Sequence, residues 1–269
     1  MWRTMTRRLT VATLNVRGLP LKGSSIAERF AAIAAELDIG DIDLVCLQEV
    51  FGYHHLAHLR KRMPSFPHIA YRPSLIGPAG GLVTLSRLRL AGATYARLPW
   101  SSRHSGMPVR SRLNARHSGM LSVRLADRGV RVLNIHPTAN TDGDWSEQNR
   151  FHEMQRDQFS ALAQAVTAEN SPAVVCGDFN VSQASTLHRE LQQRSGLRDA
   201  FDGRCPPTFH PEYLAPGNKP HCIDFILVAE TIGVDETDLL FTDRRVLPSG
   251  PTYLSDHIGL LARLQLPDR

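Results

Sequence analysis

Short apolar segments of six to eight residues recur along this chain, and each is bounded by Gly, Pro, Asp or Asn. Segments of this length with such ends are typical of buried or half-buried β-strands. We predict strands over residues 9–16, 44–50, 81–87, 120–125, 130–136, 173–178, 223–229 and 257–264. Because several of these segments follow one another without a helical segment between them, the pattern predicts mixed sheets rather than strict alternation of parallel strands and helices.

Three amphipathic segments are expected to form helices that cover the sheets. Residues 25–37 are rich in alanine and begin with Ser25 and Glu28, the spacing of a capping box. Residues 145–166 place large apolar side chains on one face, and residues 182–194 form a shorter helical segment. The helices are therefore fewer than the strands.

One domain with a substantial core accounts for the whole chain. Of its 269 residues, 42% are hydrophobic, and the sequence shows no repeat, low-complexity tract or linker. We therefore expect a single domain over residues 1–269, with its core between about residues 9 and 264. No apolar run reaches the roughly 18 residues that a membrane span needs, and the basic first residues lead directly into a strand. We accordingly expect no membrane span and a cytoplasmic protein.

Four cysteines are too few for a disulfide scaffold, and no Cys-x-x-Cys pair points to zinc or redox chemistry. Cys46 and Cys176 lie within apolar segments, where cysteine behaves as a small hydrophobic residue. Cys205 and Cys222 flank a proline-rich loop and are expected to lie near each other. Whether they form a disulfide is left open, because a cytoplasmic compartment would keep both thiols reduced.

Positive charge is concentrated between residues 97 and 131. Eight arginines stand there against Asp127 alone, a local balance of +7 in a chain whose net charge is +5. The segment is either an exposed loop or an arm that contacts substrate phosphates. In the second case Arg110, Arg112 and Arg116 are the candidate phosphate ligands.

Polar residues of kinds that carry out catalysis stand at the ends of the predicted strands or in the turns that follow. Such positions commonly hold functional groups, although each residue alone is equally typical of an ordinary turn. The residues are Asn15, Glu49, His136, Asp178, Asn180, Asp224, Asp256 and His257.

Together these residues contain the groups needed to hydrolyse a phosphodiester. A glutamate such as Glu49 offers the hard oxygen that Mg²⁺ prefers, and Mg²⁺ usually takes only one or two carboxylates. A histidine whose second ring nitrogen is oriented by a carboxylate can accept a proton from water, as His257 with Asp224 would. His136 and the amides of Asn15 and Asn180 are candidates for holding the phosphate oxygens.

Seven ordered segments of the chain resemble the endonuclease/exonuclease/phosphatase superfamily, whose fold is that of deoxyribonuclease I. They are TLNVRGL, DLVCLQEVF, GGLVTLSR, VLNIHPTAN, PAVVCGDFNV, CIDFILV and YLSDHIGLLARL, and they span about residues 9 to 264. The resemblance implies an α/β (α+β) four-layered sandwich of two mixed β-sheets flanked by helices. It places the active site at one end of the sandwich.

The resemblance also implies a divalent cation, Mg²⁺ or alternatively Mn²⁺. Glu49 would be its principal ligand, with Asn15 beside it and Asp256 near it. Members of the abasic-site endonuclease branch carry an acid where this chain has Arg17. A cation at this position cannot ligate a second metal, which disfavours that branch and favours a single metal, although one metal or two is left open. The motifs LQEVF, GDFNV and LNIH resemble the sphingomyelinase-like and deoxyribonuclease-like branches more closely.

For the reacting groups, the resemblance implies that His136 binds the phosphate while Asp178 and Asn180 position the nucleophile and the transition state. Asp224 would orient His257. Either His257 or Asp178 would be the general base for the attacking water, and the sequence leaves both open.

The residue set therefore predicts a divalent-metal-dependent phosphoesterase, in particular a phosphodiesterase that uses activated water. Its anionic substrate is either a nucleic acid, DNA or RNA, or a phospholipid or small phosphodiester. The alternative is a non-catalytic module of the same fold that binds nucleic acid or phospholipid. The presence of every candidate catalytic residue disfavours this alternative, and the sequence does not define an oligomeric state.

Overall fold

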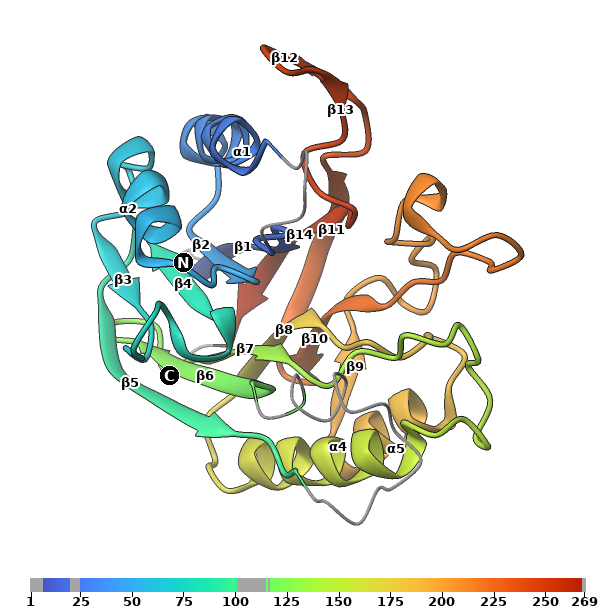
Figure 1. Ribbon diagram of the computed structural model, residues 1–269. Helices are drawn as coiled ribbons and strands as arrows, with labels where there is room; N and C mark the ends of the chain where they lie inside the picture. The colour runs from blue at the N-terminus through green and yellow to red at the C-terminus, as the bar shows by residue number, and fades with distance from the viewer. Residues whose placement is uncertain (1–6, 20–24, 101–114, 116, 268–269) are drawn as a thin grey trace.

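A computed structural model describes the fold over residues 7–19, 25–100, 115 and 117–267. Within these ranges the strands form two six-stranded sheets and one two-stranded hairpin, with helices on the outer faces of the sheets (Figure 1). Each large sheet contains one parallel pair of strands, β1 with β2 and β7 with β8, among antiparallel neighbours. The prediction of a four-layered sandwich of two mixed sheets is confirmed.

The first sheet has the strand order β11-β14-β1-β2-β4-β3. Its strands come from both ends of the chain. They are β1 (Arg7–Asn15), β2 (Leu44–Gln48), β3 (His68–Ala70), β4 (Val83–Ser86), β11 (Gly233–Leu240) and β14 (Gly259–Leu266).

The second sheet has the order β5-β6-β7-β8-β10-β9 and is made from one continuous stretch of chain. Its strands are β5 (Leu90–Arg97), β6 (Gly119–Leu125), β7 (Arg131–His136), β8 (Ala173–Asp178), β9 (Leu197–Asp199) and β10 (Asp224–Ala229). The whole second sheet is therefore inserted between β4 and β11 of the first sheet.

Helices cover each sheet on one side, and the pair labelled α1 and α2 lies opposite the pair labelled α4 and α5 in Figure 1. Within the described residues, the helices include α1 (Ile26–Ile39), α2 (Tyr53–Arg62), α4 (His152–Thr167) and α5 (Thr186–Ser195), with short 3₁₀ turns η1 (Ala79–Gly81) and η2 (Pro211–Tyr213). The hairpin consists of β12 (Arg245–Leu247) and β13 (Gly250–Thr252).

The apolar side chains divide into two main cores according to this layering. One core packs α1 and α2 against the outer face of the first sheet, with Phe30 and Leu59 fully buried in it. The larger core fills the space between the sheets and extends beneath α4 and α5. Burial of this apolar area is the main contribution to the stability of such a sandwich.

Helix α4 begins at His152, so the prediction of a helix from residue 145 is wrong over its first seven residues. Side chains compete with helix formation there. The carboxamide of Asn140 accepts the N–H of Asp142, Asp144 accepts that of Ser146, and Asn149 accepts that of Phe151. Such local side-chain bonds give the backbone an alternative to the helical hydrogen-bond ladder.

The predicted capping box at the start of α1 is also wrong. Ser25 has a left-handed φ of 40° and makes no side-chain cap hydrogen bond. Glu28 does not reach back to Ser25, because its carboxylate accepts hydrogen bonds from the backbone N–H and the hydroxyl of Ser249. These bonds tie α1 to the hairpin region instead.

Two long strands, β5 and β11, were not predicted from the sequence because both are solvent-facing edge strands. Most residues of β5 and β11 are exposed or half-buried, so their sequences lack the apolar run by which the inner strands were predicted. The inner strands lie within two residues of the predicted ends, and β8 matches the predicted segment 173–178.

All four cysteines are buried free thiols. Cys205 and Cys222 lie together as expected, and a hydrogen bond between their side chains, together with burial, raises the pKa of Cys222. The structure therefore contains no disulfide between these two residues.

His55 on α2 is a buried histidine whose charge the fold disfavours. Burial, aided by the charges of His54, His58 and Arg29, lowers its pKa to about 4, and its ring packs on Phe30 with centroids 4.9 Å apart.

We expect His55 to make the protein less stable as the pH falls from about 6.5 to about 4, because the unfolded chain then binds a proton that the folded chain does not. One such proton changes the free energy of unfolding by about 1.4 kcal/mol per pH unit at most. Urea unfolding of a His55→Gln variant across this range is expected to show a shallower loss of stability. An unchanged slope would contradict the prediction, and His68→Gln on β3 is the matched control.

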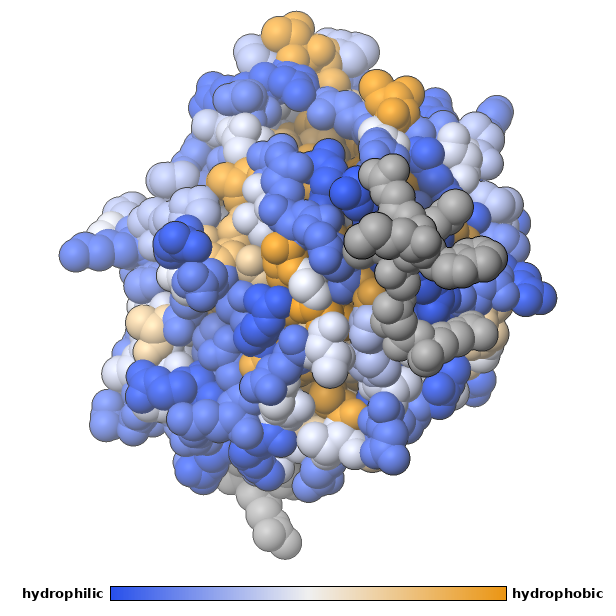
Figure 2. Space-filling model, turned by 180° about the vertical axis from the view of Figure 1, so that it is seen from behind, coloured by the Kyte–Doolittle hydropathy of each residue, from blue (hydrophilic) through white to orange (hydrophobic). Residues whose placement is uncertain are grey.

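None of the helices among the described residues combines the length and apolar composition needed to cross a membrane. On the face drawn in Figure 2, hydrophilic residues predominate and hydrophobic ones surface in separate patches.

Candidate active site

Strand ends from both sheets meet at one end of the sandwich. Because β1 and β2 run parallel, Asn15 and Gln48 pair at their carboxyl ends, and Glu49 follows directly. In the second sheet the carboxyl ends of β7 and β8 carry His136 and Asp178. The two pairs lie at the same end, because the side chains of Asn15 and Asp178 are in contact across the sheets.

Asp178 is the centre of the candidate site. Its Oδ2 accepts a hydrogen bond from Asn15 Nδ2 at 3.1 Å and lies 3.5 Å from His136 Nε2 and 3.6 Å from His257 Nε2. Its Oδ1 accepts the backbone N–H of Asn180 at 2.9 Å. Of the residues predicted for the site, four therefore contact this single buried carboxylate.

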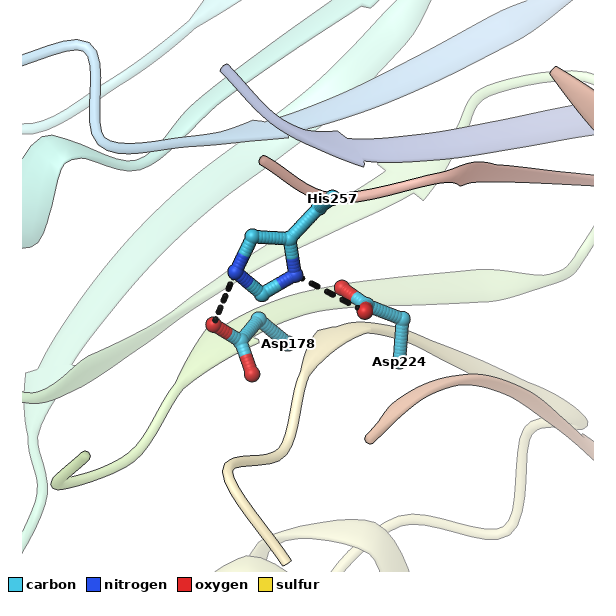
Figure 3. A group of neighbouring side chains, drawn as sticks. All are labelled: Asp178, Asp224 and His257. Atoms are coloured by element: carbon cyan, nitrogen blue, oxygen red, sulfur yellow. Dashed lines mark hydrogen bonds and ion pairs between the residues drawn. The ribbon is translucent and has the colours of Figure 1, made fainter. Parts of the chain in front are cut away.

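His257 stands between two carboxylates, as Figure 3 shows. Its Nδ1 is 2.9 Å from Asp224 Oδ2, while its Nε2 faces Asp178. Asp224 lies opposite Asp178 in the antiparallel pair β8–β10, so both acids reach the ring from neighbouring strands. The backbone N–H of Asp224 donates to Thr208 Oγ1, and Phe209 forms a bridge with His257, which fixes the loop around the ring.

These contacts determine the charges of the group. Burial opposes a charge on His257, but Asp224 and Asp178 together raise its pKa well above the ordinary value. Burial alone would raise the pKa of Asp178, but His257 and His136 lower it. Burial raises the pKa of Asp224 to about 6, against the opposing charge of His257. We therefore assign a carboxylate to Asp178 and an imidazolium to His257 at neutral pH.

His136 has a similar environment. Burial disfavours its charged form, but the hydrogen bond with Asp178 and the charges of Asp178 and Glu49 raise the pKa of the ring. The site thus holds two histidines that keep their protons more readily than a free histidine does, on either side of one ionised carboxylate.

Glu49 also contacts Asn15, whose Nδ2 donates to Glu49 Oε1 at 3.3 Å as well as to Asp178. Burial raises the pKa of Glu49, and the nearby charge of Asp256 raises it further. Asp256 pairs in turn with Arg17, whose Nε is 3.4 Å away. Two partly buried carboxylates therefore stand near each other beside one arginine.

Two groups of side chains in the described residues have donor atoms that suit a cation. Asp178, Asp224 and His257 place one ligand atom each within 4.8 Å of one another. Both nitrogens of His257 already face carboxylates in this group, however, and all three residues are buried. Mg²⁺ usually retains several waters and takes one or two carboxylates. The more accessible pair Glu49 and Asp256 fits that requirement better.

The orientation of Asn15 differs from that of a simple metal ligand. Its amide nitrogen faces Glu49 and Asp178, while its Oδ1 accepts the backbone N–H of Arg17 at 3.0 Å. In this arrangement Asn15 connects the two halves of the site, and its role as a cation ligand stays a prediction.

Left-handed backbone conformations occur at three residues of the candidate site and its surroundings. Arg17, Glu49 and Asn180 have φ angles of 51°, 63° and 56°. Such values are uncommon for residues other than glycine and persist only where the surroundings enforce them. The close packing of Gly18 provides one such constraint, because a Cβ on it would lie 1.8 Å from the carbonyl oxygen of Glu49.

Sequence reasoning missed the residues that hold the two sheets in register below the site. Gln48 Nε2 donates to Asn134 Oδ1 at 2.8 Å, and Asn134 Nδ2 donates to the carbonyl oxygens of Leu47 and Val83. Gln155 of α4 supports the next loop by donating to the carbonyl of Asn180. A polar residue within an otherwise apolar strand is the signal that could have identified Gln48 and Asn134, because buried polar groups need partners.

Two arginines of the arginine-rich segment, Arg124 and Arg131, make structural contacts. Arg131 is buried, donates to the carbonyls of Ala165 and Val166, and pairs with Glu169, which also binds Arg124. Arg131 thus joins β7 to α4. The candidate phosphate ligands Arg110, Arg112 and Arg116 lie outside the described residues.

Known proteins resemble this chain in sequence and in fold. Residues 12–257 match the sequence model of the Endonuclease/Exonuclease/phosphatase family. The chain is 24% identical over 271 aligned residues to a Drosophila melanogaster protein provisionally named a neutral sphingomyelinase, covering 96% of this chain and 61% of that protein. It is 25% identical to Nocturnin of Rattus norvegicus over 285 aligned residues, covering 97% of this chain and 63% of Nocturnin.

The chain thus spans about three fifths of the length of these curated relatives. Among solved structures, D. rerio TDP2 complexed with a single-strand DNA product superposes with a TM-score of 0.72. The identity is 16%, and the match covers 96% of this chain and 99% of that chain. At this identity the superposition establishes the shared fold.

Proposed function

Because the chain belongs to the Endonuclease/Exonuclease/phosphatase family, whose members are hydrolases acting on phosphoester bonds, we propose that it hydrolyses a phosphodiester with water as the nucleophile. The observation that carries this proposal is the position of Asp178, an ionised carboxylate held between His136 and His257. A base beside two protonated donors can accept a proton from water and stabilise the charge that develops on the phosphoryl oxygens.

In this proposal Asp178 accepts the proton of the attacking water. His257 and His136 donate to the non-bridging oxygens as negative charge develops on them, and Asp224 keeps the ring of His257 oriented and charged. The lowered pKa of Asp178 and the raised pKa of His257 favour this assignment over His257 as the base. Asn180, whose backbone N–H binds Asp178, positions the same carboxylate.

Family members are typically dependent on a divalent metal, and we propose that Glu49 and Asp256 hold Mg²⁺ here, with Mn²⁺ as a substitute. A bound divalent cation would stabilise charge on the phosphoryl oxygens. Removal of a carboxylate ligand is then expected to weaken metal binding as well as turnover.

We expect Glu49→Gln to lower both Mg²⁺ affinity and turnover by at least about tenfold, since the amide keeps the size of the side chain but removes its charge. Isothermal titration with Mg²⁺ measures the first effect without substrate. Glu230→Gln is the matched control, because Glu230 is exposed just beyond the opposite end of β10. Metal affinity equal to that of the parent would remove Glu49 from the proposed site.

The substrate class is tested by hydrolysis of plasmid DNA, abasic DNA, RNA, sphingomyelin, inositol phosphates and a small chromogenic phosphodiester, each with Mg²⁺, Mn²⁺ or chelator. Metal-dependent cleavage of at least one phosphodiester is the expected result. Cleavage that persists in chelator would contradict the metal dependence. Binding without cleavage of any member would favour the non-catalytic module.

A further inference from the structure

Exposed apolar side chains gather beside Glu49. The described residues include six large hydrophobic side chains that are exposed. One of them is Tyr53, and three others stand on segments that pack against residues 49–53. The four are Leu19, Tyr53, Leu75 and Ile76. We call them the apolar rim.

Backbone contacts fix the apolar rim to the site. Leu19 follows Gly18, whose Cα packs directly on the carbonyl of Glu49. Gly77, next to Ile76, packs equally closely on Phe51, because a Cβ on it would lie 2.3 Å from the Phe51 oxygen. The rim therefore borders the Glu49 side of the active site.

The loop that carries Leu75 and Ile76 is held by hydrogen bonds. Tyr53 donates its backbone N–H to the carbonyl of Ile76 and its hydroxyl to that of Ser74. Ser74 donates its backbone N–H and its hydroxyl to the carbonyl of Gly77. Leu75 and Ile76 are nevertheless 100% and 74% exposed. An ordered loop thus presents two adjacent aliphatic side chains to solvent.

The surrounding chain is strongly basic. Residues 50–126 contain twelve Lys and Arg and not one Asp or Glu, whereas the other residues contain 19 basic and all 26 acidic side chains. Elements of this segment, from α2 to β6, lie together on the left side of Figure 1. Arg72 beside the loop is exposed, and Arg60, Lys61 and Arg62 are exposed in the last turn of α2, at the other end of the helix from Tyr53. Three of the four residues of the apolar rim, Tyr53, Leu75 and Ile76, therefore belong to the most basic segment of the sequence.

We propose that the apolar rim docks this protein on an anionic lipid surface, so that the phosphodiester it cleaves belongs to a membrane lipid. The identification of the substrate as a membrane lipid rests on the proposed function, but the docking itself does not require catalysis. Aliphatic side chains gain free energy by entering the acyl boundary, and flanking cations are attracted to anionic headgroups. A nucleic acid would use the same cations, but it offers Leu75 and Ile76 no apolar region of comparable size.

Vesicle co-sedimentation in chelator tests docking independently of turnover. We expect binding to phosphatidylcholine vesicles that contain about 30% phosphatidylserine and little binding to phosphatidylcholine alone. The double variant Leu75→Ser/Ile76→Ser is expected to lower the partition coefficient at least about tenfold. The matched control is Ile39→Ser/Val246→Ser, which changes the two exposed apolar residues away from the rim and is expected to bind as the parent does.

Equal loss of binding in both double variants, or none in either, would overturn the proposal. Tight binding of an oligonucleotide, measured by fluorescence anisotropy, together with no binding to anionic vesicles would also overturn the proposal. This result would indicate that the basic segment binds nucleic acid. Hydrolysis of the small chromogenic phosphodiester separates docking from function. We expect Leu75→Ser/Ile76→Ser to retain this activity, whereas a parent that binds vesicles but hydrolyses no phosphodiester would overturn the proposed function and leave docking established.

Discussion

The His257→Ala variant is expected to turn over substrate about 10²- to 10³-fold more slowly than the parent, the usual loss when a hydrogen-bond donor to the developing negative charge is removed. The ring is the only described side chain placed between Asp178 and Asp224, so no described neighbour can replace it. Steady-state kinetics at saturating metal measure the loss, and thermal unfolding verifies that the variant is folded. Asp224→Asn is expected to lose less, since it leaves the ring in place.

The pH dependence distinguishes two roles for His257. Because its pKa is raised, the ring stays protonated through neutral pH and loses its proton only on the alkaline side. If the charged ring stabilises the phosphate, kcat/KM falls as the pH rises through this value. If His257 is the general base, kcat/KM rises instead. A rising profile that disappears in His257→Ala would overturn our assignment of the base to Asp178.

Asp178→Asn is expected to lower turnover about as much as His257→Ala does, by at least about 10²-fold, because it removes the proposed base. It also removes a negative charge beside both histidines. The pKa values of His136 and His257 are therefore expected to fall, which NMR titration of the ring protons measures in the absence of substrate. This second readout distinguishes loss of the carboxylate from general damage to the fold.

Asp199→Asn is the matched control for this variant. Asp199 is also a buried carboxylate and accepts hydrogen bonds from Gln183, Phe201 and Gly203, but on β9 at the edge of the second sheet. We expect it to lower stability and to leave turnover per folded molecule near that of the parent. Retention of full activity by Asp178→Asn would exclude Asp178 as the base.

The sequence predicted the inner strands well because their apolar runs are set by burial on both faces. Strand β8, for instance, is buried throughout and has the predicted limits. The start of α4 could not be predicted in the same way, because the periodicity of residues 145–151 is helical while their Asn and Asp neighbours bind the backbone locally. Edge strands such as β11 have no apolar face that a pattern could reveal.

The members of the site were predictable from their positions at strand ends, but their partners were not. Asn15 and Asp178 are 163 residues apart, and only the packing of one sheet on the other brings their side chains together. The same holds for Gln48 and Asn134, which lie 86 residues apart and form a hydrogen bond across the sheets. Periodicity gives the face on which a residue lies, whereas contacts between sheets depend on the twist and offset of both.

The insertion of the second sheet between β4 and β11 affects how the protein matures on the ribosome. The second sheet can form as soon as its own continuous segment has emerged. Strand β1, by contrast, keeps one edge unpaired until β14 is synthesised. His257 lies just before that strand and arrives equally late. A nascent chain therefore cannot assemble the proposed site until His257 has emerged, and until then the free edge of β1 is the one that chaperones would have to shield.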